Sequence, residues 1–180
     1  PSFPYIALLA SGGHTALYEV RGPDQMEILG QTRDDAAGEA FDKVAKMLGL
    51  DYPGGPIVDR MAKDGNPDAF AFTAPKVAAH DFSFSGLKTS VLRVLEKELA
   101  GGRKPSDAFV RDVCASAQGA IVSILVKKLE AAALQMGRSA IAIQGGVSAN
   151  SGLRQAVLDL GSQHGWTVHV PPFRYCTDNG

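Results

Sequence analysis

The stretch that decides the fold is Pro4-Tyr-Ile-Ala-Leu-Leu-Ala-Ser-Gly-Gly-His-Thr-Ala-Leu-Tyr-Glu-Val20, in which a pair of glycines joins two apolar segments. The first segment is a continuous apolar run that ends at Ala10, and the second alternates between apolar and polar residues as a strand does. Met26-Glu-Ile-Leu-Gly30 follows as a third strand. The pattern predicts a three-stranded meander whose first turn carries the two glycines.

After the meander the hydrophobic period becomes that of a helix. Phe41, Val44, Ala45 and Leu48 recur at i, i+3, i+4 and i+7, which predicts a helix over about 37–48. Further helices are predicted from the first-turn Pro56 through Lys63, from a Ser85 cap over 86–99, from a Ser106 cap through 136, and over 151–163. Residues 65–82 show no clean period, and strands are predicted at 140–143 and 167–170.

The chain therefore divides into a meander (1–32), a helical middle (37–136) and a β-α-β unit (139–180). This order predicts one α/β domain with helices packed on a mixed sheet. We expect the meander to form one edge of the sheet and the remaining strands to be parallel.

Composition excludes several classes of protein. The chain has 180 residues, of which 45% are hydrophobic and 21% charged, as in a globular domain and unlike a disordered chain. Its net charge of -1 gives no whole-chain attraction to a polyanion. Its two cysteines, Cys114 and Cys176, form no CxxC, which excludes a cysteine-rich zinc module and a disulfide framework.

No membrane or targeting segment is apparent in the sequence. The most apolar run, 119–126, is far shorter than the ~20 residues of a membrane span. We therefore expect a cytoplasmic protein with no membrane contact. The chain starts without Met, and we expect it to be a fragment of a longer protein.

Two glycine turns are candidate ligand sites. In Leu9-Ala-Ser-Gly-Gly-His-Thr15, glycines that tolerate positive φ allow backbone N–H groups to converge on a phosphate, and Ser11 adds a hydroxyl; a plain hairpin turn is the equally favoured alternative. In Ile143-Gln-Gly-Gly-Val-Ser-Ala-Asn150, a strand and a glycine pair precede a helix N-terminus that favours a polar ligand. The alternative is that Asn150 or Ser148 simply caps that helix. Two such turns in one small domain favour a nucleotide cleft, provided that they lie together.

The acidic and histidine residues give weaker signals. Glu39–Lys43 and Asp42–Lys46 are spaced as i, i+4 ion pairs on an outer helix face, although Asp42 is also placed to reach a ribose hydroxyl. The Tyr52-Pro-Gly-Gly-Pro56 turn either contacts a sugar or only ends a helix. The four histidines form no metal motif, and Asp178 is either one metal ligand or a helix cap.

Six motifs, in this order, resemble those of the TsaD family of tRNA adenosine threonylcarbamoyltransferases, formerly called O-sialoglycoprotein endopeptidases. They are Ala10-Ser-Gly-Gly-His-Thr15, Asp35-Ala-Ala-Gly-Glu-Ala-Phe-Asp-Lys43, Leu50-Asp-Tyr-Pro-Gly-Gly-Pro56, Asp81-Phe-Ser-Phe-Ser-Gly-Leu-Lys-Thr89, Gly145-Gly-Val-Ser-Ala-Asn150 and Tyr175-Cys-Thr-Asp-Asn-Gly180. The resemblance implies a two-lobed actin-like ATPase fold (ASKHA, ribonuclease-H-like). This chain would be its second lobe, incomplete because the first lobe, with an HxxxH pair at its end, and the terminal helix are absent.

The resemblance also implies roles for individual residues. It places Asp42 and Gly55 on the ribose side, Asn150 on the nucleotide and Asp178 on a metal, with Lys88 as a weaker candidate for substrate or tRNA contact. The phosphate-binding hairpin would be lined by Leu9, Ala10, Ser11, Gly12 and Gly13. No residue is assigned as a general acid or base. The metal would be one divalent ion, iron in preference to zinc, held by the two absent histidines and Asp178, so we expect neither metal nor activity in this fragment.

The activity implied is transfer of a threonylcarbamoyl group from threonylcarbamoyl-adenylate to the adenosine beside the tRNA anticodon. Expected ligands and partners are that adenylate, AMP or ATP, tRNA, a same-fold paralogue and a P-loop ATPase. The main alternative is a nucleotide-binding or kinase-like member of the same superfamily. A scaffold paralogue is disfavoured by the presence of Asn150 and Asp178, and a metallopeptidase by the lack of the HExxH glutamate.

Overall fold

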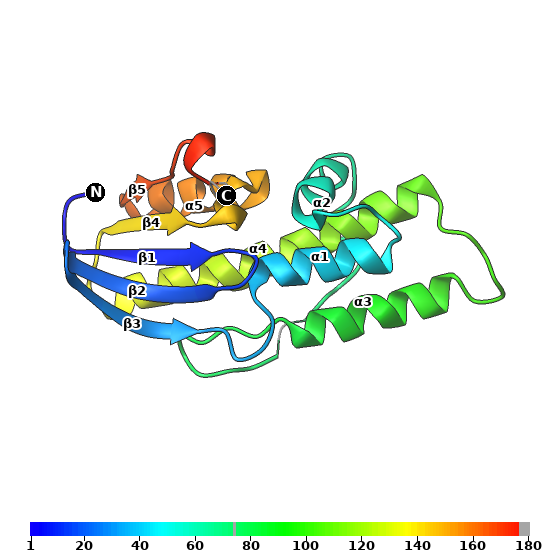
Figure 1. Cartoon of the computed structure of the whole chain (residues 1–180), viewed down its shortest axis with the longest axis horizontal. Helices are drawn as coiled ribbons and strands as arrows, with labels where there is room; N and C mark the ends of the chain where they lie inside the picture. The colour runs from blue at the N-terminus through cyan, green and yellow to red at the C-terminus, as the bar shows by residue number, and fades with distance from the viewer. Residues whose placement is uncertain (74, 177–180) are drawn as a thin grey trace.

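The structure, a computed structural model, describes residues 1–73 and 75–176 and contains a five-stranded mixed sheet of order β3-β2-β1-β4-β5 (Figure 1). The strands are β1 (Tyr5–Ala10), β2 (Thr15–Gly22), β3 (Gln25–Gln31), β4 (Ala140–Gln144) and β5 (Thr167–His169). β1 pairs antiparallel with β2 and parallel with β4, and β5 is parallel to β4. The predicted meander and its place at one edge of the sheet are confirmed.

Every predicted helix is present, with bounds within two residues of those expected. The helices are α1 (Ala37–Met47), α2 (Gly54–Ala62), α3 (Ser85–Glu98), α4 (Asp107–Gln135) and α5 (Ser151–His164), with 3-10 turns η1 (Gly146–Ala149) and η2 (Phe173–Tyr175). In Figure 1, β1 and β4 point toward α1 and α2, and α4 runs from the α3–α4 loop to the far side of the sheet. The turn after β1 and the η1 turn after β4 therefore emerge at the carboxyl ends of these two neighbouring strands.

The main core lies between one face of the sheet and the helices. Ile6 and Leu8 of β1 and Ile141 of β4 are fully buried there with Ile121 and Leu125 of α4. This arrangement follows from the period of two, because alternate residues of each strand face the helices. The opposite face carries a smaller cluster of buried residues: Tyr5, Ala7, Val20 and Ala142.

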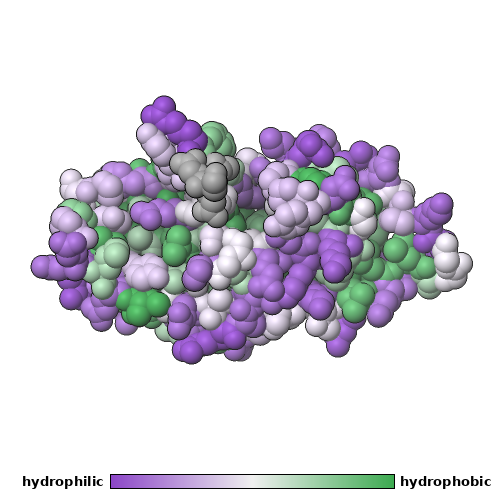
Figure 2. All heavy atoms as spheres, viewed as in Figure 1, coloured by the Kyte–Doolittle hydropathy of each residue, from purple (hydrophilic) through white to green (hydrophobic). Residues whose placement is uncertain are grey.

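Helix α4 contains the apolar run at 119–126 and is much longer than that run. The whole helix has 29 residues and is long and apolar enough, by length and composition, to cross a membrane. Of its most apolar window, 61% is buried inside the fold, as in the core helix of a globular domain. Figure 2 shows hydrophobic residues in small separate areas among hydrophilic ones on the face in view.

Of the two predicted serine caps, one is confirmed and one is wrong. The Ser106 Oγ accepts a hydrogen bond from the Phe109 N–H (3.1 Å) and caps α4. Ser85 is instead the first residue of α3, and the cap is supplied by Asp34, whose Oδ1 accepts from the N–H groups of Phe84 (2.7 Å) and Ser85 (3.3 Å). Asp34 lies about fifty positions earlier in the chain, so a search for a local capping residue does not find it.

Candidate nucleotide-binding site

The two glycine turns lie against each other at the carboxyl ends of β1 and β4. Because these strands are parallel neighbours, the turns that follow them emerge at the same edge of the sheet. A Cβ on Gly145, whose φ is +89°, would lie 2.4 Å from the Ala10 carbonyl oxygen. Glycine is therefore required at Gly145 both by its backbone conformation and by the close approach of β1.

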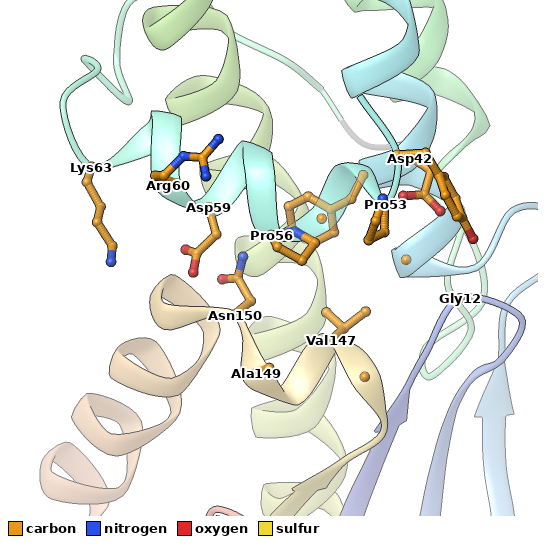
Figure 3. Close-up of a pocket in the computed structure, with 15 residues that line it drawn as sticks. Gly12, Asp42, Pro53, Pro56, Asp59, Arg60, Lys63, Val147, Ala149 and Asn150 are labelled. Atoms are coloured by element: carbon orange, nitrogen blue, oxygen red, sulfur yellow. The ribbon is translucent and has the colours of Figure 1, made fainter. Parts of the chain in front are cut away.

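Gly12 and Gly146, one from each turn, line the same cavity of about 530 Å³ (Figure 3). The two turns therefore lie together, which is the condition that the nucleotide-cleft hypothesis set. The volume lies in the range of small-molecule sites. The remaining wall comes from α1, from the segment leading into α2, from α2 itself and from the stretch around η1: Gly38, Phe41, Asp42, Tyr52, Pro53, Gly55, Pro56, Asp59, Arg60, Lys63, Val147, Ala149 and Asn150.

The hairpin turn differs in detail from the expected phosphate loop. Neither Gly12 nor Gly13 has a positive φ, and the N–H groups of Gly13 and His14 donate to the Ser11 Oγ at 3.4 and 3.0 Å. The Ser11 hydroxyl in turn donates to the His14 carbonyl (3.3 Å). These groups therefore hold the turn together and do not converge on open space.

The close approach of α1 to this turn requires a glycine on α1, at position 38. Gly38, in the first turn of α1, donates its N–H to the Ser11 carbonyl (3.0 Å). A Cβ on Gly38 would lie 2.7 Å from both the Gly12 Cα and the Ser11 oxygen. At Gly12 itself a Cβ would meet nothing within 4 Å, so this glycine borders open space in the cavity.

Asp42 caps the neighbouring helix and makes no outward ion pair. Its Oδ1 accepts from the N–H of Gly54, the first residue of α2 (2.8 Å), and the described residues contain no ion pair between Asp42 and Lys46. The expected Glu39–Lys43 pair is confirmed at 2.9 Å. One carboxylate oxygen of Asp42 is thus engaged as a helix cap, and the residue lines the cavity.

Asn150 is both a helix cap and a cavity residue, so the two interpretations of it are compatible. Its Oδ1 accepts from the Leu153 N–H (2.9 Å) at the start of α5, and its Nδ2 donates to the Gln118 Oε1 on α4 (2.7 Å). Ser148, the other candidate cap, donates to the Gly145 carbonyl (2.5 Å). Asn150 is therefore held rigidly beside the second glycine turn.

Sequence reasoning missed Asp59, which joins the two walls of the cavity. From α2 its carboxylate accepts from the Ser151 N–H (3.1 Å) and the Ser151 Oγ (2.6 Å) at the start of α5. The signal that could have revealed it is helical spacing, because Asp59 lies four positions after the predicted Gly55. Arg60 on α2 and Lys63 directly after it bring positive charge to the cavity.

The predicted site residues fall into three groups: some line the cavity, some lie beside it, and some lie elsewhere. Gly12, Asp42, Gly55 and Asn150 belong to its wall, while Leu9, Ala10, Ser11 and Gly13 adjoin Gly12 without lining it. Lys88 is exposed on α3. Asp178 is outside the described residues, among which no three His, Cys, Asp or Glu side chains form a metal-binding group.

Solved structures resemble the chain in fold. Full-length HypF in its phosphate- and nucleotide-bound form matches with a TM-score of 0.65 at 11% identity, over 93% of this chain and 30% of HypF. The activator of the 2-hydroxyisocaproyl-CoA dehydratase from Clostridium difficile, with bound ADPNP, matches with a TM-score of 0.54 at 15% identity, over 95% of this chain and 55% of the activator. The fold is that of the actin-like ATPases, as predicted.

Sequence relatives extend over the whole chain. The tRNA N6-adenosine threonylcarbamoyltransferase of Porphyromonas gingivalis is 53% identical over 99% of this chain and 52% of its own length. That of Chromobacterium violaceum is 48% identical over 100% of this chain and 53% of its own. The chain thus spans about half the length of the curated relatives it matches. Because the family model "TsaD: tRNA N6-adenosine threonylcarbamoyltransferase" also matches residues 1–180, the chain belongs to the TsaD family.

Proposed function

We propose that the intact protein containing this chain transfers a threonylcarbamoyl group from threonylcarbamoyl-adenylate to the adenosine beside the anticodon of tRNA. The observation that carries the proposal is the cavity between the two glycine turns, in a chain that the family model matches throughout. Relatives that are about 50% identical bear the name of this activity.

The cavity offers a distinct environment to each part of an adenylate. The phosphate would lie against Gly12, where the missing side chain leaves open space. The ribose would lie near Asp42 and Gly55, because a carboxylate accepts hydrogen bonds from hydroxyl groups. Asn150 would contact the nucleotide through the amide hydrogen and oxygen lone pair that its two internal hydrogen bonds leave over.

The reaction is a carbamoyl transfer. The exocyclic amine of the tRNA adenine attacks the carbamoyl carbon, the bond from that carbon to the adenylate oxygen breaks, AMP leaves, and the amine loses a proton. We assign no general base among the described residues. This chain would contribute chiefly by holding the adenylate in a fixed orientation toward the amine.

A metal and partner proteins are also part of the proposal. Because the described residues hold no metal-binding group, they do not form such a site alone. We propose one divalent ion, iron in preference to zinc, with Asp178 as a ligand and the other ligands from outside this chain. Further proposed partners are a same-fold paralogue and a P-loop ATPase, in the cytoplasm.

The test is to incubate the intact protein and these two partners with threonylcarbamoyl-adenylate and unmodified tRNA. Digestion of the tRNA and mass spectrometry of its nucleosides should show threonylcarbamoyladenosine, with one AMP released for each group transferred. Binding of the adenylate without any transfer would favour a nucleotide-binding or kinase-like protein instead.

A further inference from the structure

Arg154, on the first turn of α5, joins two segments that are separate in sequence. Its Nε donates to the Ser148 carbonyl in η1 (2.7 Å), and its Nη2 donates to the Pro171 carbonyl beyond β5 (2.6 Å). The planar guanidinium has several donors in a fixed fork, so it can hold two carbonyls in one geometry. Through Arg154, the turn that lines the cavity is connected to the segment Pro171–Cys176.

The same side chain makes two more contacts within Pro171–Cys176. Its guanidinium carbon lies 4.0 Å from the centre of the Phe173 ring, and its Nη2 lies 3.1 Å from the Cys176 Sγ. Arg154 therefore contacts the start, the middle and the end of this segment.

The segment has few other means of attachment. Pro171 and Pro172 have no N–H and cannot extend the pairing of β5 with β4. The remaining backbone hydrogen bonds here, from Tyr175 to Pro172 and from Cys176 to Phe173, are internal to the segment. Among the described residues, only Arg154 forms hydrogen bonds between Pro171–Cys176 and the rest of the fold.

The segment also lies close to the cavity turn. The Cys176 carbonyl oxygen lies 3.6 Å from the position a Cβ would take on Gly146, which lines the cavity. Two positions after Cys176 is Asp178, the residue that the family resemblance assigns to the metal.

From these contacts we propose that Arg154 is a positioning residue, which fixes the Pro171–Cys176 segment against the glycine turn of the cavity. The inference rests on the proposed transferase function for its catalytic consequence, but its structural part stands apart from that function. Loss of the fork should leave the cavity wall in place, since no residue of Pro171–Cys176 lines it and the stretch around η1 keeps the hydrogen bonds of Ser148 to Gly145 and of Asn150 to Gln118 and Leu153.

The structural part is tested by alkylating the intact protein and following the thiols of Cys176 and Cys114 separately by peptide mass spectrometry. Cys176 is 2% exposed and reports on the segment, whereas Cys114 is 0% exposed in the main core and reports on global unfolding. We expect Arg154→Ala to accelerate alkylation of Cys176 while Cys114 stays protected. Arg154→Lys should do the same, because one ammonium cannot reproduce the fork or the stack on Phe173. If Arg154→Ala exposes both thiols, that variant has unfolded globally. The inference is then tested in Arg154→Lys, which keeps the aliphatic stem: it predicts faster alkylation of Cys176 while Cys114 stays protected.

Arg174 provides the matched control. It belongs to the same segment and stacks on Tyr175 at 4.8 Å, but it forms no hydrogen bond to the glycine turn within the described part of the chain. Arg174→Ala should leave the alkylation of both thiols near the wild-type rates. Continued protection of Cys176 in both Arg154 variants would overturn the inference.

The catalytic part is tested by steady-state kinetics of transfer to tRNA. Displacement of a segment by about 1 Å can lower a rate by roughly 10- to 100-fold, so we expect kcat to fall by that factor in Arg154→Ala. The KM for the adenylate should change by less than about threefold, because the binding wall is preserved. Faster alkylation with unchanged kcat would overturn the catalytic part. If the wild-type protein transfers nothing, the proposed function fails, and the alkylation rates still decide whether Arg154 fixes the segment.

Discussion

Gly12 and Gly38 lie against each other beside the cavity, yet a methyl group on each should have a different effect. In Gly38→Ala, the new Cβ would lie 2.7 Å from the Gly12 Cα and the Ser11 oxygen, which are backbone atoms. We expect this overpacking to lower the free energy of unfolding by about 1–3 kcal/mol, an effect that the better helix propensity of alanine reduces. Urea denaturation of the intact protein measures it.

Gly12→Ala should behave in the opposite way. Its Cβ meets no atom within 4 Å and its φ is not positive, so stability should stay within about 0.5 kcal/mol of wild type. The methyl group would occupy the cavity, and calorimetric titration with AMP should show weaker binding. Unchanged AMP affinity in Gly12→Ala would mean that the nucleotide does not approach this turn.

Asp42 allows a test of the ribose contact with little change in structure. In Asp42→Asn, the amide oxygen can still accept from the Gly54 N–H and cap α2, whereas the charge is lost. Hydrogen bonds to charged groups contribute about 1.5–3 kcal/mol, so AMP affinity should fall by roughly tenfold or more. Glu39→Gln is the control on the same helix, because Glu39 pairs with Lys43 and is absent from the cavity wall. Equal AMP affinities in both variants would refute the role of Asp42.

At the scale of secondary-structure elements, three helices begin without a capping side chain of their own. The residues before α1, α2 and α3 are Ala36, Pro53 and Phe84, none of which forms a side-chain cap. The caps come from Thr15, Asp42 and Asp34, which accept from the N–H groups of Ala37, Gly54 and Phe84. The helix starts are thus held by tertiary contacts, and those of α1 and α2 also fix how these two helices meet at the cavity.

Removal of one such cap should destabilise the protein in a pH-dependent way. Asp34→Ala would leave the first N–H groups of α3 without their acceptor, which should lower the free energy of unfolding by about 1 kcal/mol. Burial alone would raise the pKa of Asp34, but hydrogen bonds from Ser83, Phe84 and Ser85 more than offset it and lower that pKa. A lowered folded-state pKa means that the carboxylate stabilises the protein above the usual aspartate value of about 3.9 and that this contribution disappears as pH falls below it. Urea denaturation across this range should show wild type and variant converging in acid; a constant difference would contradict the assignment.

For the whole molecule, sequence predicted the fold better than the side-chain geometry of the site. The periods of the strands and helices are local, so these elements could be predicted, whereas the parallel pairing of β1 with β4, which brings the two glycine turns together, is a tertiary contact that the sequence left open. The caps from Asp34 and Asp42 depend on how helices meet in space, and no local pattern encodes that. Helical spacing from Gly55 could have placed Asp59 on the cavity side of α2, but its contact with Ser151 depends on the approach of α2 to α5, which that spacing does not encode.

The far end of the sheet gives a test of whether stability and ligand binding are separable in this fold. Glu19 on β2 is 0% exposed and pairs with Ile6 near the start of β1, while the cavity lies beyond the end of β1. Arg138, just after α4, donates its Nε and Nη2 to the Glu19 Oε1 at 2.7 and 2.6 Å. This ion pair therefore ties the end of the longest helix to the sheet.

Arg138→Ala would leave Glu19 buried with only the half-exposed Arg21 as a partner, and we expect a loss of about 3 kcal/mol. Burial alone would raise the pKa of Glu19, but its hydrogen bonds with Arg138 and Arg21 more than offset this and lower that pKa. In the variant, burial is less compensated and the pKa of Glu19 should rise. Protonation of Glu19 then removes a poorly compensated buried charge from the variant, but in the wild type it weakens the ion pair with Arg138. The difference in unfolding free energy between the two proteins should therefore narrow as pH falls. Arg21→Ala, at the exposed partner, should lower the free energy of unfolding by less than about 1 kcal/mol.

AMP affinity should match wild type in both variants, because neither change reaches the cavity. A loss of AMP binding in Arg138→Ala, at a temperature where this variant remains folded, would show that the two ends of the sheet are coupled.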